Sequence, residues 1–306
     1  MVSPAASCAD ALVAPFSAGR GRTAVDVPPD ACDCHVHLYD ARHPTAAGAT
    51  LRPPDASAAD YRQLQRRTGT QRVVFVTPST YGTDNGALCD ALAAFGTQAR
   101  GVAVVDEQVS DAELAALHHR GVRGIRLNLS LGVVNSASQI APLARRIAPM
   151  GWHLQLLAPA NAWTELAGAL AHLPVPLVFD HFGRLAPSMA GKHPSHALIL
   201  RLLQERRAWV KVSGAYIVSE QGAPGYEDVA ALARSFLKAA PDRVLWGSDW
   251  PHASATAGHQ AMPDDAQQMT LLAGWTGTAG VLNRVLVDNP SELYGFDRHP
   301  PLQETS

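Results

Sequence analysis

Four residues, far apart in the chain, have the side chains that catalysis or metal binding requires. His35 and His37 lie two residues apart, His181 comes much later, and Asp249 later still. In a strand, residues i and i+2 point to the same face, so the first two imidazoles project together. Imidazoles grouped in this way bind a metal ion or polarise a carbonyl group. Only a closed fold brings segments so distant in sequence together.

The surroundings of these residues favour a functional role over a structural one. The His-x-His pair ends an apolar run, where burying two imidazoles without partners is costly. Asp249 stands between another apolar run and Trp250-Pro251, an unusual place for a solvated acid. The pair Asp180-His181 alone favours neither reading. His252 either lines the same pocket or is an ordinary loop histidine.

Further polar residues follow other apolar runs. Arg126 and Asn128 share a face, and an arginine at a strand end suits the anchoring of a substrate carboxylate. The alternative for Arg126 is an ion pair at the rim of the fold. Ser79 begins a turn-rich loop that either donates hydrogen bonds to substrate or, through Asp84, caps the next helix. Lys211 lies within an apolar run and can pair internally, so we place it outside the site.

Eight apolar runs alternate with amphipathic segments and predict the elements that position these residues. Near-continuous apolar character is typical of strands buried on both faces of a parallel sheet. The predicted strands are Ala31–Leu38, Arg72–Thr77, Gly101–Val105, Gly124–Leu127, Trp152–Leu157, Val175–Asp180, Trp209–Ser213 and Arg243–Ser248. The predicted helices are Ser57–Thr68, Asn85–Phe95, Asp111–Arg120, Ser138–Met150, Ala162–Leu173, Ser195–Glu205, Tyr226–Ala240, Ala266–Leu272 and Ala279–Val287, the last stopped by Asn289-Pro290.

This alternation predicts a TIM-like (β/α)8 barrel, an α/β fold, in a single domain over residues 30–296. Active sites of such barrels lie at the C-terminal ends of the strands, which is where the polar candidates fall. Residues 1–29 are rich in Ala, Ser, Gly and Pro and predict a disordered or loosely packed N-terminal extension. Residues 297–306 form a C-terminal tail.

Composition excludes several other functions. A net charge of −2 gives no electrostatic basis for binding nucleic acid or an anionic membrane. No apolar run approaches the ~18 residues that span a bilayer. The four cysteines form no CxxC pair, and Cys32 and Cys34 suit a reduced core, which favours the cytoplasm. There is no Gly-x-Ser-x-Gly elbow, phosphate loop or Gly-x-Gly-x-x-Gly motif.

Six motifs over roughly residues 30–296 resemble the amidohydrolase superfamily. More narrowly, they resemble the 2-pyrone-4,6-dicarboxylate lactonase group, whose relatives act on sugar lactones and muconolactones. The motifs are Asp33–His37, Pro78–Asn85, Gly124–Asn128, Asp180–Gly183, Val210–Gly214 and Trp246–His252. The resemblance implies that His35 and His37 are the strand-one pair, His181 the strand-six histidine and Asp249 the strand-eight aspartate of a barrel active site.

The same resemblance limits the metal chemistry. Many amidohydrolases add a carboxylated lysine or a glutamate after strand four and a histidine after strand five, where this chain has Arg126, Asn128 and Gln155. A binuclear centre is therefore not expected. His35, His37, His181 and Asp249 would hold at most one divalent ion, such as zinc or manganese. Because the pyrone dicarboxylate lactonases work without metal, whereas some sister lactonases bind one, we expect no required cofactor.

The expected substrate is a small lactone that is opened to a hydroxy acid. The dicarboxylate lactonase uses several arginines, but segments 130–134 and 213–218 contain none, and Tyr216 stands in the second. One anion anchor, Arg126, suits a lactone with one carboxylate or a sugar lactone. Asp249 would be the general base, while the three histidines polarise the carbonyl; Ser79, Asn128 and Tyr216 would be secondary contacts. A metal-dependent decarboxylase, a lactone isomerase and a non-catalytic binding protein are the alternatives, and the oligomeric state stays open.

Overall fold

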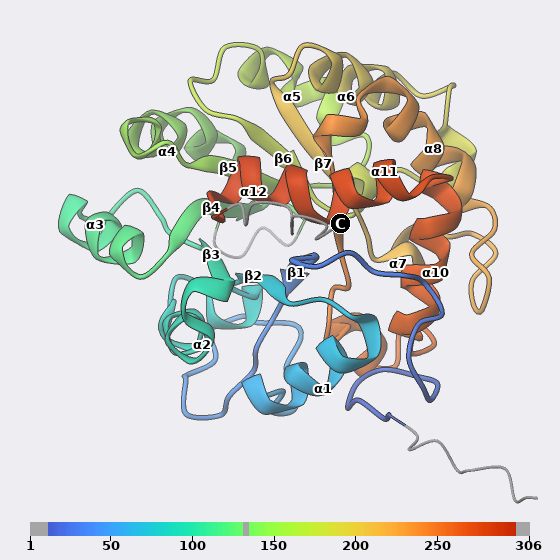
Figure 1. Cartoon of the computed structure of the whole chain (residues 1–306). Helices are drawn as coiled ribbons and strands as arrows, with labels where there is room; N and C mark the ends of the chain where they lie inside the picture. Colours follow the sequence, from blue (N-terminus) through green and yellow to red (C-terminus); the bar gives the residue numbers. More distant parts are fainter. Residues whose placement is uncertain (1–11, 131–134, 298–306) are drawn as a thin grey trace, which may run out of the picture.

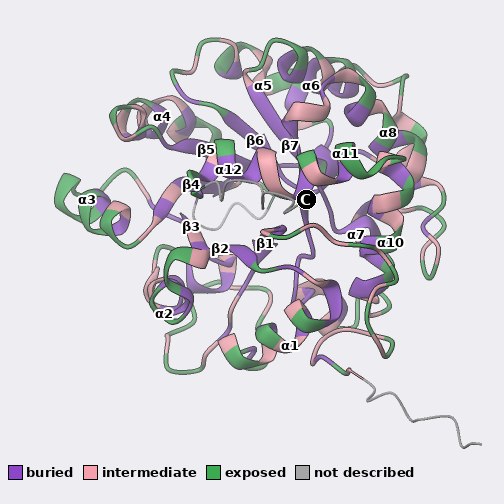
Figure 2. Cartoon of the chain, viewed as in Figure 1, coloured by how far each residue is buried: buried purple, intermediate pink, exposed green. Residues whose placement is uncertain are grey.

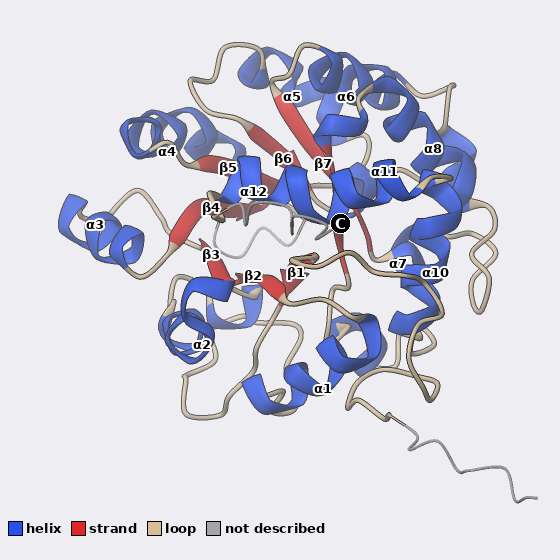
Figure 3. Ribbon diagram, viewed as in Figure 1, coloured by secondary structure: helices blue, strands red, loops and turns tan. Residues whose placement is uncertain are grey.

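The computed structural model describes residues 12–130 and 135–297 and has eight parallel strands, each hydrogen-bonded to the next in chain order. Helices surround these strands on the outside (Figures 1 and 3). The predicted TIM-like barrel is therefore confirmed, and each predicted strand is present with its ends shifted by at most two residues. The strands are β1 Cys32–Val36, β2 Arg72–Val76, β3 Ala99–Ala103, β4 Val122–Asn128, β5 His153–Leu157, β6 Leu177–Phe179, β7 Ala208–Ser213 and β8 Val244–Gly247.

Helices follow the strands and cover the outside of the barrel. They are α1 Ala58–Thr68, α2 Gly86–Phe95, α3 Asp111–His119, α4 Ile140–Ile147, α5 Ala162–Leu170, α6 Pro194–Gln204, α7 Ala215–Val218, α8 Val229–Ala239, α9 Ala253–Thr256, α10 Asp265–Thr276, α11 Ala279–Asn283 and α12 Asn289–Tyr294. Ser110 caps α3, accepting from the backbone N–H of Glu113. Within the described ranges, no helix is long and apolar enough to cross a membrane.

Alternation along each strand builds two hydrophobic cores. On β2, Val73 and Phe75 belong to the large core between strands and helices, whereas Val74 and Val76 point into the barrel. Tyr294 and Phe296, at the C-terminal end of the chain, complete the inner core. Because both faces of the strands are buried (Figure 2), the strand sequences read as continuous apolar runs.

The barrel closes where the end of β8 meets β1. The backbone N–H of Asp249 donates to the carbonyl of His35 at 2.9 Å, and that of His37 donates to the carbonyl of Trp250 at 2.8 Å. The buried carboxylate of Asp33 accepts from the backbone N–H of Ser248 at 2.9 Å and from that of His35 at 3.2 Å. These bonds place the aspartate of the last strand beside the histidines of the first.

Of the N-terminal extension expected over residues 1–29, residues 1–11 lie outside the described residues, and residues 14–21 pack against the barrel. Ala14 is buried, the carbonyl of Pro15 accepts from the indole N–H of Trp250 at 2.8 Å, and Phe16 lies edge-on to the same ring. Arg67 of α1, buried, donates to the carbonyls of Ala18 and Gly21. The sequence of this N-terminal segment lacks periodicity because side chains of the barrel, rather than secondary structure of its own, hold the segment in place.

Near the C-terminus the expected helix stop at Asn289-Pro290 is wrong. Pro290 lies in the first turn of α12, where a missing N–H costs nothing and the ring favours the helical φ. A π-helical turn, Arg284–Asp288, joins α11 to α12. The short helices α7 and α9, which directly follow β7 and β8, were not expected because four residues show no periodicity.

Arg67 provides a test of the N-terminal packing. Its guanidinium also donates to the hydroxyl of Ser17 and pairs with Asp264 at 2.8 Å. We expect Arg67→Met to lower the free energy of unfolding by about 2–3 kcal/mol, because buried carbonyls lose a charged donor. Chemical denaturation measures this change.

The matched control is Arg66→Met, on the exposed side of the same helix, which should change stability by less than about 0.5 kcal/mol. Equal stability of the Arg67 variant and the control would contradict the packing described for the N-terminal segment.

Candidate active site

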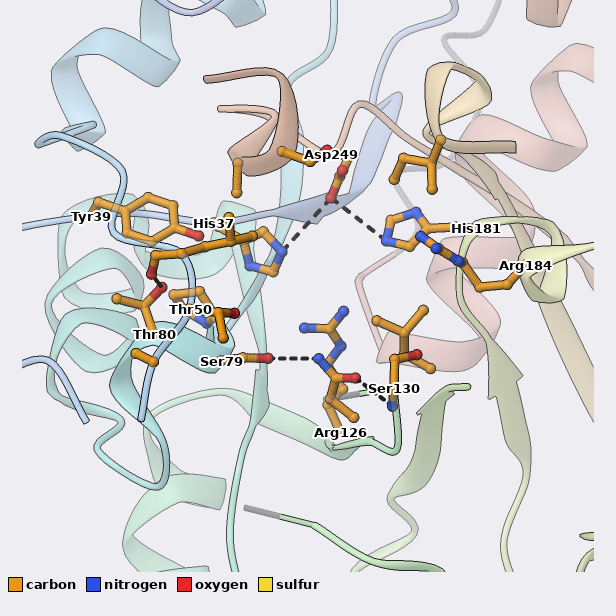
Figure 4. A pocket seen from close by; sticks show the side chains of 18 residues that line it. His37, Tyr39, Thr50, Ser79, Thr80, Arg126, Ser130, His181, Arg184 and Asp249 are labelled. Carbon is orange, nitrogen blue, oxygen red and sulfur yellow. Dashed lines mark hydrogen bonds and ion pairs between the residues drawn. The ribbon is translucent and has the colours of Figure 1, made fainter. Parts of the chain in front are cut away.

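Three imidazoles surround one carboxylate at the C-terminal end of the barrel. The Oδ1 atom of Asp249 lies 3.6 Å from Nε2 of His35 and 3.7 Å from Nε2 of both His37 and His181. The Nε2 atoms of His35 and His37 are 3.3 Å apart. Figure 4 shows His37 and His181 on opposite sides of Asp249. The four residues predicted from the sequence therefore converge on one point.

The other ring nitrogen of each histidine has a partner behind the site. Nδ1 of His37 lies 2.8 Å from the carbonyl oxygen of Val76, and Nδ1 of His181 lies 3.0 Å from the hydroxyl of Ser213. A carbonyl can only accept, so the proton of neutral His37 is on Nδ1 and its Nε2 lone pair faces Asp249. A hydroxyl can donate or accept, so His181 is free to present an Nε2–H.

A layer of buried charges supports the histidines from below. Asp180 has one oxygen 3.3 Å from Nδ1 of His35, and its other oxygen accepts from Nε of Arg126 and from Nε2 of Gln155, both at 3.0 Å. Lys211, fully buried, donates to Oε1 of Gln155 at 2.7 Å. Its Nζ lies 3.6 Å from Asp180 and 3.3 Å from Nδ1 of His35. Asp180 thus faces two cations, which makes its burial tolerable.

This environment sets the protonation of the site. Burial lowers the pKa of His37 to about 4, with Arg126 adding to the effect and Asp249 opposing it. Burial also lowers the pKa of His35 and of His181. Burial alone would raise the pKa of Asp249, but the three histidines and a hydrogen bond from Tyr216 bring it down to about 2. Near pH 7 the site therefore consists of neutral imidazoles around an ionised carboxylate.

Tyr216 and His252 lie behind Asp249 and outside the cavity lining. The hydroxyl of Tyr216 donates to Oδ2 of Asp249 at 2.6 Å, which leaves Oδ1 facing the histidines. His252 is fully buried, contacts the ring of Tyr216 edge-on, and pairs with Asp265 at 3.1 Å. Of the two readings that the sequence left open for His252, the pocket-lining one is not what the structure shows.

A cavity of about 210 Å³ is lined by three of the four central residues, His37, His181 and Asp249. Ser79, Arg126 and Asn128, the substrate contacts expected from the sequence, also line it, and the amide of Asn128 donates to the hydroxyl of Ser79 at 2.8 Å. Figure 4 shows the Arg126 guanidinium pointing towards the space between His37 and His181. Residues 131–134, part of the arginine-free segment after strand four, lie outside the described residues.

Sequence reasoning missed three residues that bear on the site. Arg184 lines the open side of the cavity and adds a second cation to Arg126. Tyr39, two residues after His37, lines it too. Lys211 pairs internally, as expected, but one of its partners is His35 itself. The position of Arg184, three residues after His181 at the end of β6, was the available signal.

Three of the central residues, His35, His37 and Asp249, fit one divalent ion. A tetrahedral zinc with bonds of about 2.0–2.1 Å separates its ligand atoms by roughly 3.3–3.4 Å. The separations between Oδ1 of Asp249 and the histidine Nε2 atoms, and between the Nε2 atoms of His35 and His37, are 3.3–3.7 Å. Partners on the Nδ1 atoms, as present here, commonly orient metal-binding histidines. His35, His37 and Asp249 form one set able to hold an ion, and His35, Asp180 and His181 form another.

Comparison with known proteins agrees with this geometry. The model of the amidohydrolase family matches residues 32–296. The chain belongs to the amidohydrolase family. It is 36% identical over 280 residues to a 2-pyrone-4,6-dicarboxylate hydrolase of Comamonas testosteroni, a match that covers 88% of this chain and 91% of the relative.

Two further amidohydrolase relatives have different activities. A 4-sulfomuconolactone hydrolase of Hydrogenophaga intermedia is 31% identical, with 88% of this chain and 90% of the relative covered. A D-galactarolactone isomerase of Agrobacterium fabrum is 30% identical, with 87% and 91% covered. The resemblance inferred from the six motifs is thus confirmed.

The protonation of His37 can be measured directly. We expect ¹⁵N NMR of metal-stripped protein to show a neutral, Nδ1-protonated imidazole at pH 7 that titrates near pH 4. Since an unfolded histidine titrates near 6.5, the folded state binds fewer protons between these values, so His37 lowers stability as the pH falls from about 6.5 to about 4. The His37→Gln variant assigns the signal. A midpoint above 6 would contradict the buried, neutral state.

Proposed function

We propose that this amidohydrolase hydrolyses an anionic lactone to a hydroxy acid. The observation that carries the proposal is an ionised Asp249, ringed by three imidazole Nε2 atoms, at the floor of a cavity that also holds Arg126 and Arg184. Such a site combines a base, donors for a developing oxyanion and anchors for a carboxylate. Two relatives are hydrolases of a pyrone dicarboxylate and a sulfomuconolactone, which supports the same class of substrate.

Asp249 acts as the general base. Tyr216 occupies Oδ2, so Oδ1 is the oxygen that accepts a proton from water as the water attacks the lactone carbonyl. The carboxyl then returns this proton to the leaving alkoxide, and ring opening yields the hydroxy acid. The pKa of about 2 makes Asp249 a weak base in the free protein, and a bound lactone that excludes water from the cavity raises its basicity.

The histidines have separate roles in this mechanism. His181, whose Nδ1 can accept from Ser213, directs an Nε2–H at the carbonyl oxygen and stabilises the oxyanion. Neutral His37 has no proton on Nε2, and His35 is buried and does not line the cavity, so these two would polarise the carbonyl only through an ion. His35, His37, His181 and Asp249 would hold one zinc or manganese ion, which when bound supplies Lewis-acid polarisation of the carbonyl. We favour hydrolysis that does not require it.

Two cations in the cavity widen the substrate class expected from sequence. Arg126 is held at Nε by Asp180, so its terminal amino groups are oriented for a substrate oxygen. Arg184 offers a second positive group on the open side. A lactone with one carboxylate near Arg126 fits, and a second anionic group near Arg184 fits as well. Ser79 and Asn128 contribute hydrogen bonds, while Tyr216 acts through Asp249.

Replacement of the base tests the mechanism. We expect Asp249→Asn to lower kcat on the best lactone substrate by at least about 100-fold, because the amide cannot accept the proton of water. A panel of pyrone carboxylates, muconolactones and sugar lactones, each with and without chelator, identifies that substrate. Near-normal turnover by the purified, folded variant would rule this mechanism out.

Arg184 tests the preference for anions. Arg184→Met should raise KM for a lactone with two anionic groups roughly fivefold, since a solvent-exposed ion pair contributes about 1 kcal/mol. The KM for a neutral sugar lactone serves as the control and should stay unchanged. Equal effects on both substrates would show that Arg184 does not contact an anionic group.

A lactone isomerase is the second candidate, favoured by the galactarolactone isomerase among the relatives. Attack by a substrate hydroxyl instead of water needs the same base and donors. Product identification by NMR separates the two reactions, and decarboxylation as well. We further propose a small-molecule partner only, with no nucleic acid or membrane, and a cytoplasmic location consistent with the free thiols of Cys32, Cys34 and Cys89.

A further inference from the structure

His35 has two buried partners at the same ring nitrogen. Its Nδ1 lies 3.3 Å from a carboxylate oxygen of Asp180 and 3.3 Å from Nζ of Lys211. All three side chains are fully buried. A carboxylate only accepts hydrogen bonds, whereas the lysine ammonium only donates them. The two partners therefore require opposite positions for the single proton of neutral His35.

The position of this proton determines whether Nε2 of His35 offers a lone pair or an N–H to the site. When Asp180 accepts from Nδ1–H, the Nε2 lone pair faces Asp249. When Lys211 donates to Nδ1, the proton moves to Nε2 and an N–H faces the site. Only the first tautomer can bind a metal ion through Nε2, because a metal ligand must offer a lone pair.

His37 favours one of these tautomers. Its own proton is held on Nδ1 by the carbonyl of Val76, so its Nε2 is an acceptor, 3.3 Å from Nε2 of His35. An Nε2–H on His35 completes a chain of donors from Lys211 through His35 and His37 to Val76. The other tautomer places two lone pairs 3.3 Å apart, a repulsive arrangement unless a cation lies beside them.

The position of Lys211 is fixed. Gln155 accepts from Lys211 at 2.7 Å through Oε1 and donates to Asp180 at 3.0 Å through Nε2, so both ends of its amide are engaged. Arg126 donates to the same oxygen of Asp180, Oδ2, and the other oxygen, Oδ1, lies 3.3 Å from His35 and 3.6 Å from Lys211. Lys211 is thereby directed at His35 while Asp180 is shared among several donors.

We propose that Lys211 is a positioning residue that holds metal-free His35 in its Nε2–H tautomer and so weakens divalent-ion binding at His35, His37, His181 and Asp249. Asp180 is the alternative partner, which accepts the Nδ1 proton when an ion is bound. This inference concerns the same site as the proposed function but does not depend on the identity of the lactone. Its readouts are tautomer and zinc affinity, which can fail while the lactonase mechanism holds.

The first measurement needs no variant of Lys211. In ¹⁵N-histidine-labelled, chelator-treated protein at pH 7, His35, assigned with His35→Gln, should show a protonated Nε2 and an unprotonated Nδ1. A protonated Nδ1 in the wild-type protein overturns the proposal, whatever the folding of any variant.

The second measurement uses Lys211→Met, which keeps the length of the chain but removes the donor. We expect the His35 proton to move to Nδ1 and the Zn²⁺ affinity, determined by competition with a chromophoric chelator, to rise about tenfold, the lower end of effects seen for partners of metal ligands. An unchanged tautomer or an unchanged affinity in the folded variant contradicts the proposal.

Arg184→Met is the matched control for charge. It removes a positive group from the same cavity without contacting His35, so it should leave the His35 nitrogen signals unchanged and raise Zn²⁺ affinity less than Lys211→Met does. If both variants raise the affinity equally and neither moves the proton, loss of charge alone explains the effect and the role of Lys211 is rejected.

Discussion

Closure of the barrel between its first and last strands is the constraint on which the site depends. Backbone hydrogen bonds tie Asp249 to His35 and His37 to Trp250. The separation between carboxylate and imidazoles is therefore set by main chain rather than by flexible side chains. At the same joint a Cβ on Gly247 would lie 2.6 Å from Cβ of His35, so only glycine permits this approach.

The second organising feature is the compensation of charge beneath the histidines. A buried carboxylate is tolerated when cations and hydrogen bonds surround it, and Asp180 has Arg126, Lys211 and Gln155. The same contacts also orient the side chains that partner Asp180. Arg126 is oriented towards the cavity because Asp180 holds one end of it, and His35 is oriented because it lies between Asp180 and Lys211. The contacts that stabilise the buried Asp180 thus also orient two side chains of the proposed active site.

Much of this arrangement follows from the sequence, because strands buried on both faces read as apolar runs and polar residues at their ends stand out. His35, His37, His181 and Asp249 could be found in this way. Arg184 could not be placed, since it follows a turn in which His181, Phe182 and Arg184 all have positive φ, a conformation that no strand or helix pattern predicts. Lys211 was placed outside the site because it could pair internally, and sequence does not show that one of its partners across the barrel is His35. The proton position on His37 depends on a carbonyl of the neighbouring strand, which only the register reveals.

The inner core also bears on the order in which the molecule assembles. Tyr294 and Phe296 complete the interior of the barrel from the C-terminal end, while Pro15 and Phe16 contact Trp250 from the N-terminal end. Contacts between opposite ends of a chain carry a large loop-closure entropy and form late in folding. The helices and the central strands can therefore form before Asp249 lies near His35 and His37. During refolding, activity should accordingly appear after most of the helical circular-dichroism signal, because activity requires the closed barrel.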